Sequence, residues 1–182
     1  MSRKDAILER AVEVASEQGL EGLTIGRLST ELGLSKSGLF GHFGSKEELQ
    51  LAAVDAAGAI FYREVIEPAL EAPEGAARLR AYCEGFVSYL ERKVFSGGCF
   101  FAAASAEFDS RPGPVREKLR EGQQALLREL TRQAKLAGAE DPEQLVFEVH
   151  SLIQGANARH QLLDDTQAFA RARSAMERLL PA

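Results

Sequence analysis

Residues 24–46 read TIGRLSTELGLSKSGLFGHFGSK and predict two short helices joined by a tight turn. Thr24 is placed as the N-cap of the first helix, and apolar residues follow it at helical spacing. Gly33 supplies the permissive backbone that a sharp helix end requires. Ser35 then caps the second helix, which runs until Gly44 ends it. The stretch therefore predicts a helix-turn-helix unit.

The second helix of this unit has the composition expected of a helix that enters the major groove of DNA. Ser37 and Gly38 are small, so the backbone can come close to phosphates and base edges. Leu39 and Phe43 are expected to hold the opposite face on the core. Directly afterwards, Ser45 begins a capping box that opens a third helix. Three helices in this order predict a small DNA-binding domain.

The charge around the second helix agrees with a polyanionic partner. Between Glu31 and Glu47 the chain has no acidic residue, but it has the basic residues Lys36, His42 and Lys46. The two lysines are expected to contact phosphates, and His42 either packs or makes a further phosphate contact. Lys46 lies in the first turn of the third helix, where the helix dipole disfavours a cation, so we expect it to have a partner outside the chain.

Residues 33–49, GLSKSGLFGHFGSKEEL, resemble the signature of the tetracycline-repressor (TetR) family of transcription regulators. The preceding residues that match the family's first two helices are Ala11, Ala15, Gly19, Thr24, Ile25 and Leu32. Family members commonly have Tyr where this chain has Phe40, and a residue with a side chain where it has Gly41. Together, the pattern and the resemblance predict DNA contacts by Thr24, Ser35, Lys36, Ser37, Gly38, Phe40, His42 and Lys46.

The rest of the chain predicts an all-α protein of about nine helices, with no convincing strand. Residues 98–103 and 107–115 resemble one regulatory-domain subgroup of the same family. We therefore expect a helix-turn-helix domain at residues 1–50 and a ligand-binding and dimerisation domain at residues 51–182. Within the second domain, Pro68 is expected to end the helix that begins after Ser45, and residues 72–75 are linker-like.

The composition of the chain limits the kinds of function that it can have. The 182 residues carry a formal net charge of -5, and residues 1–50 hold six Lys and Arg against eight Asp and Glu. These acids cluster on the first helix, at Glu9, Glu13 and Glu17, and at Glu21, away from the expected DNA face. Local distribution rather than the total charge must therefore favour DNA. Two cysteines are too few for a disulfide framework. The sequence shows neither a signal peptide nor a membrane span, so we expect a soluble cytoplasmic protein without membrane partners.

The resemblance implies a homodimer that binds a palindromic operator in double-stranded DNA and is released by a small-molecule inducer, as a repressor. The two last helices, at residues 142–164 and 167–180, are expected to form a four-helix bundle across the two-fold axis. The side chains predicted for this interface are Leu152, Ala156, Leu163, Ala172, Met176 and Leu179.

Aromatic residues of the second domain are first of all expected to form its core, but in this family an apolar inducer site often shares them. The polar candidates beside them lie on the helix at residues 142–164. The predicted ligand site comprises Phe86, Tyr89, Phe100, Ala103, Phe147, His150, Gln154 and Asn157.

Two other function classes stand beside the repressor. Phe40 and Gly41 are the hints of a ligand-binding or protein-interaction module without operator binding. An enzyme has little support, because no phosphate-binding glycine loop or nucleophile with a base can be assembled. No cofactor or metal site is expected: His150 and His160 lie ten residues apart, and Cys99 is better explained as a core residue than as a redox switch.

Overall fold

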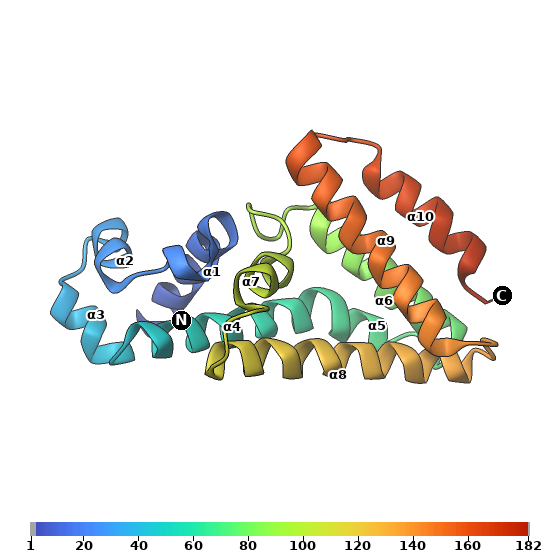
Figure 1. The fold of residues 1–182 in the computed structure, drawn as a ribbon, viewed down its shortest axis with the longest axis horizontal. Helices are drawn as coiled ribbons and strands as arrows, with labels where there is room; N and C mark the ends of the chain where they lie inside the picture. The colour runs from blue at the N-terminus through green and yellow to red at the C-terminus, as the bar shows by residue number, and fades with distance from the viewer. Residues whose placement is uncertain (1–2, 182) are drawn as a thin grey trace. The chain divides into compact units, whose positions relative to one another are not determined.

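The computed structural model describes residues 3–181, apart from the side chains of Arg3 and Phe40. The regular elements among the described residues are all helices, with no strand, as expected. The helices are α1 (Arg3–Gly22), α2 (Ile25–Leu32), α3 (Lys36–Phe43), α4 (Lys46–Phe61), the π-helical turn η1 (Tyr62–Ile66), α5 (Glu67–Leu70), α6 (Ala76–Glu91), α7 (Phe100–Phe108), α8 (Pro114–Leu136), α9 (Pro142–Leu163) and α10 (Ala168–Leu179) (Figure 1).

The two helices of the helix-turn-helix unit begin and end where the sequence places them. The Thr24 hydroxyl accepts a hydrogen bond from the Arg27 amide at 3.2 Å, which caps α2. Gly33 ends α2 in the left-handed region, with φ 62°. The Ser35 hydroxyl accepts from the Gly38 amide at 3.1 Å and caps α3. The local signals of residues 24–46 are thus confirmed.

Pro68 does not end the helix that begins at Lys46, contrary to the sequence prediction. The backbone widens into the π-helical turn at Tyr62–Ile66 and continues as α5 to Leu70. Because proline has no N–H group and its ring clashes with the preceding turn, a local change of helical pitch is a recognised way to accommodate it. The helices α4, η1 and α5 therefore form one continuous segment, so that the described residues contain nine continuous helices.

Two compact units divide the chain differently from the functional boundary expected at residue 50. The first unit holds the described residues up to residue 60 together with residues 95–122. The second holds residues 61–94 and those from 123 onward. The helix α7 therefore belongs to the same unit as the helix-turn-helix, and the boundary at residue 50 stays a prediction about function.

Inside the first unit, α7 supplies an acceptor for a break in α1. Gly19 has φ 77° and interrupts the helical backbone, which leaves the amides after it without helical acceptors. The Glu107 carboxylate accepts hydrogen bonds from the Leu20 amide at 2.7 Å and the Glu21 amide at 3.4 Å. Gly97 also lies so close to the Ser16 carbonyl that a Cβ would not fit. Residues 95–108 are thereby fixed against α1.

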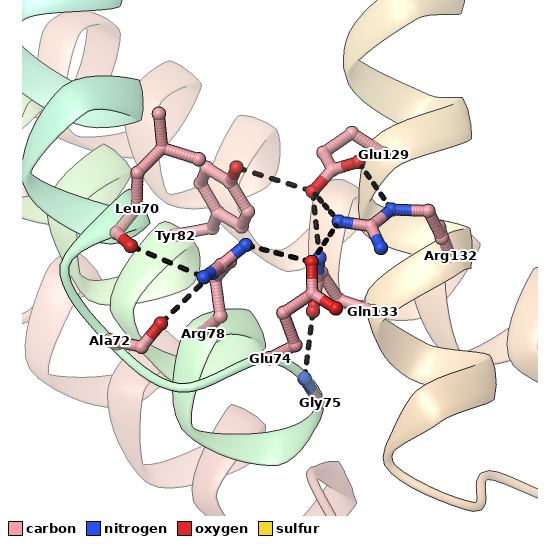
Figure 2. A network of polar contacts seen from close by, with 9 residues as sticks. All are labelled: Leu70, Ala72, Glu74, Gly75, Arg78, Tyr82, Glu129, Arg132 and Gln133. Carbon is pink, nitrogen blue, oxygen red and sulfur yellow. Dashed lines mark hydrogen bonds and ion pairs between the residues drawn. The ribbon is translucent and has the colours of Figure 1, made fainter.

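In the second unit, a hydrogen-bond network holds the α5–α6 loop on α8 (Figure 2). The fully buried Gln133 accepts from the Gly75 amide at 2.8 Å and donates to Glu129 at 2.7 Å. Arg78 donates to the carbonyl oxygens of Ala72 and Leu70. Residues 72–75, expected to be linker-like, therefore form a tightly bonded turn.

The core of the second unit contains an aromatic cluster. The ring of Phe61 meets those of Phe86 and Tyr89 edge-on, with centroids 5.0 and 5.4 Å apart. All three side chains are buried. Edge-to-face contacts of this kind stabilise a pair by about 0.5–1.5 kcal/mol beyond the effect of the buried area.

No described helix is both long enough and apolar enough to cross a membrane.

Candidate nucleic-acid interface and ligand cavity

The short helix α3 presents one polar face to solvent and one apolar face to the core. Leu39 and Phe43 are buried, as predicted. Lys36, Ser37 and Gly38 are exposed at the N-terminal end of the helix. The helix thus has its small and basic residues on the accessible side, which is the arrangement that base readout requires.

The other residues predicted to contact DNA lie around this helix. Thr24, Ser35 and His42 are exposed, which favours a phosphate contact for His42 over a packing role. Lys46 follows at the start of α4. Both Thr24 and Ser35 use their hydroxyls as helix caps. The side chain of Phe40 lies outside the described part of the structure.

Two carboxylates of the first unit are neutralised by cations. Glu31 lies 2.8 Å from Arg10 and 3.2 Å from Arg27. Burial opposes ionisation there, but hydrogen bonds from these two guanidiniums lower the pKa of Glu31 overall. Glu21 is paired in the same way with Lys46. The negative charge that the sequence places in this unit is therefore partly compensated beside the helix-turn-helix.

The pairing of Lys46 corrects one expectation. The sequence suggested a partner outside the chain, yet Lys46 Nζ lies 2.9 Å from Glu21 Oε2. Sequence reasoning missed Glu21, which follows Gly19 by two residues and was expected to point away from the DNA face. It also missed Glu107, although the glycine break in α1 is the signal that an acceptor is needed.

The predicted ligand-site residues are divided between the two compact units. Phe100 and Ala103 belong to the first unit, and the other six belong to the second. Phe147 is 67% exposed, so its assignment to the aromatic core is wrong. The rotation of α9 about its axis explains this exposure, because Val146 and Val149 lie on the buried face and Phe147 does not.

Phe86 and His150 border a small cavity between α6, α8 and α9, which Tyr82, Cys83 and Ile153 also line. Its volume is about 10 Å³, room for a single water molecule at most. Burial lowers the pKa of His150 and raises that of the Cys83 thiol to about 12. Both shifts favour the uncharged forms of the two side chains beside the cavity.

Near the cavity, His150 and Gln154 are neighbours on α9. The nitrogen atoms His150 Nε2 and Gln154 Nε2 lie 3.5 Å apart, and Gln154 Oε1 is buried with no hydrogen-bond partner among the described residues. Tyr89 is buried in the aromatic cluster, and Asn157 is buried one turn further along α9. His150 and Gln154 thus supply polar groups beside an otherwise apolar wall.

The outer face of α9 and α10 forms an open apolar groove. Four of the six predicted interface residues line it: Leu152, Ala156, Ala172 and Leu179. Met176 does not, because its side chain is buried inside the protomer and 3% exposed. Met176 therefore belongs to the core of the protomer, and its place in the seam stays a prediction. Leu163 is exposed at the end of α9.

Two family models match the chain. One, described as "Tetracyclin repressor-like, C-terminal domain", matches residues 75–176. The other, described as "Bacterial regulatory proteins, tetR family", matches residues 7–53. The HTH-type transcriptional repressor AcnR of Corynebacterium efficiens is 42% identical over 52 residues, which are 29% of this chain. The match spans 28% of that repressor's length.

Solved structures share the fold over nearly the whole chain. A TetR-family regulator from Streptomyces coelicolor has a TM-score of 0.85 at 23% identity, covering 97% of this chain and 87% of its own. A TetR regulator from Legionella pneumophila has a TM-score of 0.86 at 15% identity, with 99% and 98% covered. AibR, solved with isovaleryl coenzyme A and operator DNA, has a TM-score of 0.76 at 21% identity, with 99% and 98% covered.

Proposed function

The chain belongs to the TetR family of bacterial regulatory proteins, and we propose that it is a homodimeric repressor. It binds a palindromic operator through α3 and is released by a small apolar inducer. We place its action in the cytoplasm, where bacterial operators are accessible. One observation carries the DNA-binding part of the proposal: α3 exposes Lys36, Ser37 and Gly38 while Leu39 and Phe43 hold it on the core.

The physical chemistry of this surface sets how DNA is bound. Lys36, His42 and Lys46 contact phosphates and position the helix, without reading sequence. Ser37 and Gly38 lie where base edges are read. A net charge of -5 limits non-specific attraction, so the protein should discriminate its operator well at moderate salt.

A titration of labelled DNA by fluorescence anisotropy tests the proposal. The probe is a duplex from the region upstream of the protein's own gene, and the control is a shuffled duplex of equal length and composition. We expect tighter binding to the upstream duplex, and loss of that preference in Ser37→Trp, which blocks docking. A Ser174→Trp variant, exposed on α10, serves as the matched control. Equal and weak binding of both duplexes would favour the module without operator binding.

Dimerisation in this proposal uses the apolar groove of α9 and α10. Leu152, Ala156, Ala172 and Leu179 line it, and Phe147 adds an exposed aromatic ring. Apolar surface of this kind on a soluble protein marks a binding face. A two-fold dimer presents two α3 helices to half-sites about 34–36 Å apart, or a little more. Sedimentation at micromolar concentration tests the dimer directly.

The inducer part of the proposal rests on the cavity bordered by Phe86 and His150. At about 10 Å³ this cavity is too small for an inducer, so in this proposal the ligand widens it by moving α6 and α9 apart. AibR, with its acyl-coenzyme A ligand and operator DNA, is a precedent for both kinds of partner on this fold. A thermal-shift screen of apolar compounds, followed by DNA titration with each hit, tests the coupling.

Thermodynamic linkage gives that screen a strict criterion. An inducer that weakens operator binding must itself be weakened by operator DNA by the same factor. Typical coupling of about 1–3 kcal/mol corresponds to a 5- to 150-fold change. If hits that bind the second unit leave operator affinity unchanged, the induction model fails for those ligands.

A further inference from the structure

The two ends of the α9–α10 groove carry opposite unbalanced charges. At one end, the Glu148 carboxylate accepts a hydrogen bond from the Gln144 side chain at 2.8 Å, and none of the ion pairs among the described residues includes it. At the other end, Arg159 and Arg171 both pair with Asp165, at 3.0 and 2.8 Å. Two guanidiniums share one carboxylate there, so a positive charge is left over.

All three charged side chains line the groove itself rather than a distant surface. The side chains of Arg159 and Arg171 are 59% and 65% exposed. Between the charged ends, α9 contributes the small residues Gly155 and Ala156, which let a second helix approach closely. The groove therefore has an apolar middle, an acidic end and a basic end.

Two-fold symmetry turns this pattern into a self-complementary one. In an isologous contact, residue i meets residue j of the partner, and j meets i. The α9 residues that line the groove run from Phe147 to Arg159, so their midpoint is Ile153. Glu148 lies five residues before this midpoint and Arg159 six residues after it. An axis that crosses α9 near the midpoint therefore brings Glu148 opposite Arg159 of the partner subunit.

We propose that Glu148 of each protomer pairs with Arg159 of the partner subunit, and that these two pairs set the register of α9 against its symmetry mate. The inference rests on the proposed dimer and adds what fixes its geometry. Asp165 keeps Arg171 when Arg159 turns to the partner, so neither carboxylate is left without a cation. A shifted register moves Glu148 away from Arg159 of the partner subunit and loses both pairs, which costs affinity and selects against it.

Charge reversal with mixing tests the register. In Glu148→Arg alone, the new arginine faces Arg159 twice, and in Arg159→Glu alone, the new glutamate faces Glu148 twice. We expect each variant to weaken self-association by about tenfold or more, measured by sedimentation, as repulsion across an interface does. In an equimolar mixture of the two variants, both contacts pair opposite charges again. The mixture should therefore form a heterodimer with near wild-type affinity.

Two reversals outside the groove are matched controls: Glu140→Arg in the loop before α9 and Arg128→Glu on α8, both at exposed positions. Each should leave dimerisation unchanged. Because Arg159→Glu also places an acid near Asp165, Arg159→Gln provides a milder variant that weakens the dimer without repulsion. Thermal unfolding confirms that each variant is folded.

The outcomes separate the register from the dimer itself. A wild-type protein that sediments as a monomer at micromolar concentration overturns the proposed dimer and the register with it. A wild-type dimer whose single reversals remain fully dimeric overturns the register alone. Single variants that are weakened but do not recover on mixing also overturn it, because recovery requires the two specific pairs.

Discussion

Glu21 Oε2 accepts a hydrogen bond from Lys46 Nζ at 2.9 Å, which joins the end of α1 to the start of α4. The other carboxylate oxygen lies 3.4 Å from Arg111. The hydrogen bond from Lys46 has the largest influence on the pKa of Glu21 and lowers it. Burial raises this pKa and a hydrogen bond from Gln50 lowers it further, so that the pKa is lowered overall. The lysine expected to contact a phosphate is therefore paired with a carboxylate of its own chain.

Glu21→Gln should increase DNA affinity, because Lys46 then reaches a phosphate without leaving an anionic partner. An exposed ion pair contributes about 0.2–1 kcal/mol, so the expected gain is roughly 1.4- to fivefold for operator and shuffled DNA alike. Anisotropy titrations at fixed salt measure it. Glu17→Gln, exposed on α1, is the matched control. Unchanged or weaker binding in Glu21→Gln would show that the pair does not compete with DNA.

Lys46→Ala should weaken binding to operator and shuffled DNA by similar factors, because a phosphate contact positions the protein without reading bases. The variant removes one such contact from each protomer of the proposed dimer, so the steepness of the plot of log affinity against log salt should fall by about two units. Titrations at salt concentrations from about 50 to about 200 mM measure the slope, because DNA affinity depends strongly on salt in this range. Lys135→Ala on α8 serves as the control, and an unaltered slope in a folded Lys46→Ala variant contradicts the assignment.

Gln133→Leu should destabilise the second unit, because the buried Gly75 amide loses its acceptor while the volume is nearly kept. An unsatisfied buried amide costs about 1–3 kcal/mol of the free energy of unfolding. Urea unfolding measures the loss. Gln124→Leu, exposed on the same helix, should change it little. Equal midpoints for the two variants would mean that the network in Figure 2 contributes nothing to stability.

His150 should make stability depend on pH in the acidic range. Burial lowers its pKa in the folded state, whereas the unfolded value is about 6.5. Below that value the unfolded chain binds the extra proton first, so the free energy of unfolding falls as the pH drops through the interval between the two values. Urea midpoints measured from pH about 8 down to about 5 follow the effect.

The matching variant is His150→Gln, which removes the proton site beside the cavity. It should flatten the pH dependence of unfolding between neutral pH and the onset of carboxyl titration near pH ~4.3. His42→Gln, at an exposed position on α3, is the control. A pH dependence that persists in His150→Gln must arise from other groups, and the burial argument for His150 would then be wrong.

Local features of the sequence determined the helix-turn-helix in detail. Thr24, Gly33 and Ser35 act on amides within a few residues of themselves, so their roles follow from composition and spacing alone. The same holds for Asp141, which caps α9 by accepting from the Gln144 amide at 3.0 Å. Capping and turn formation are short-range effects, and the bonds involved exist as soon as the local backbone forms.

Only the tertiary structure decided which side chains meet across the chain and which face of a helix is covered. Gln133 lies 58 residues from Gly75, and Glu107 lies 87 residues from Leu20. Met176 and Phe147 are both apolar, yet the first is buried and the second exposed. When a helix has a broad apolar stripe, its sequence does not fix which part of the stripe faces the core. The packing of neighbouring helices decides this. Burial and long-range pairing are therefore properties of the assembled core, which residue spacing alone leaves undetermined.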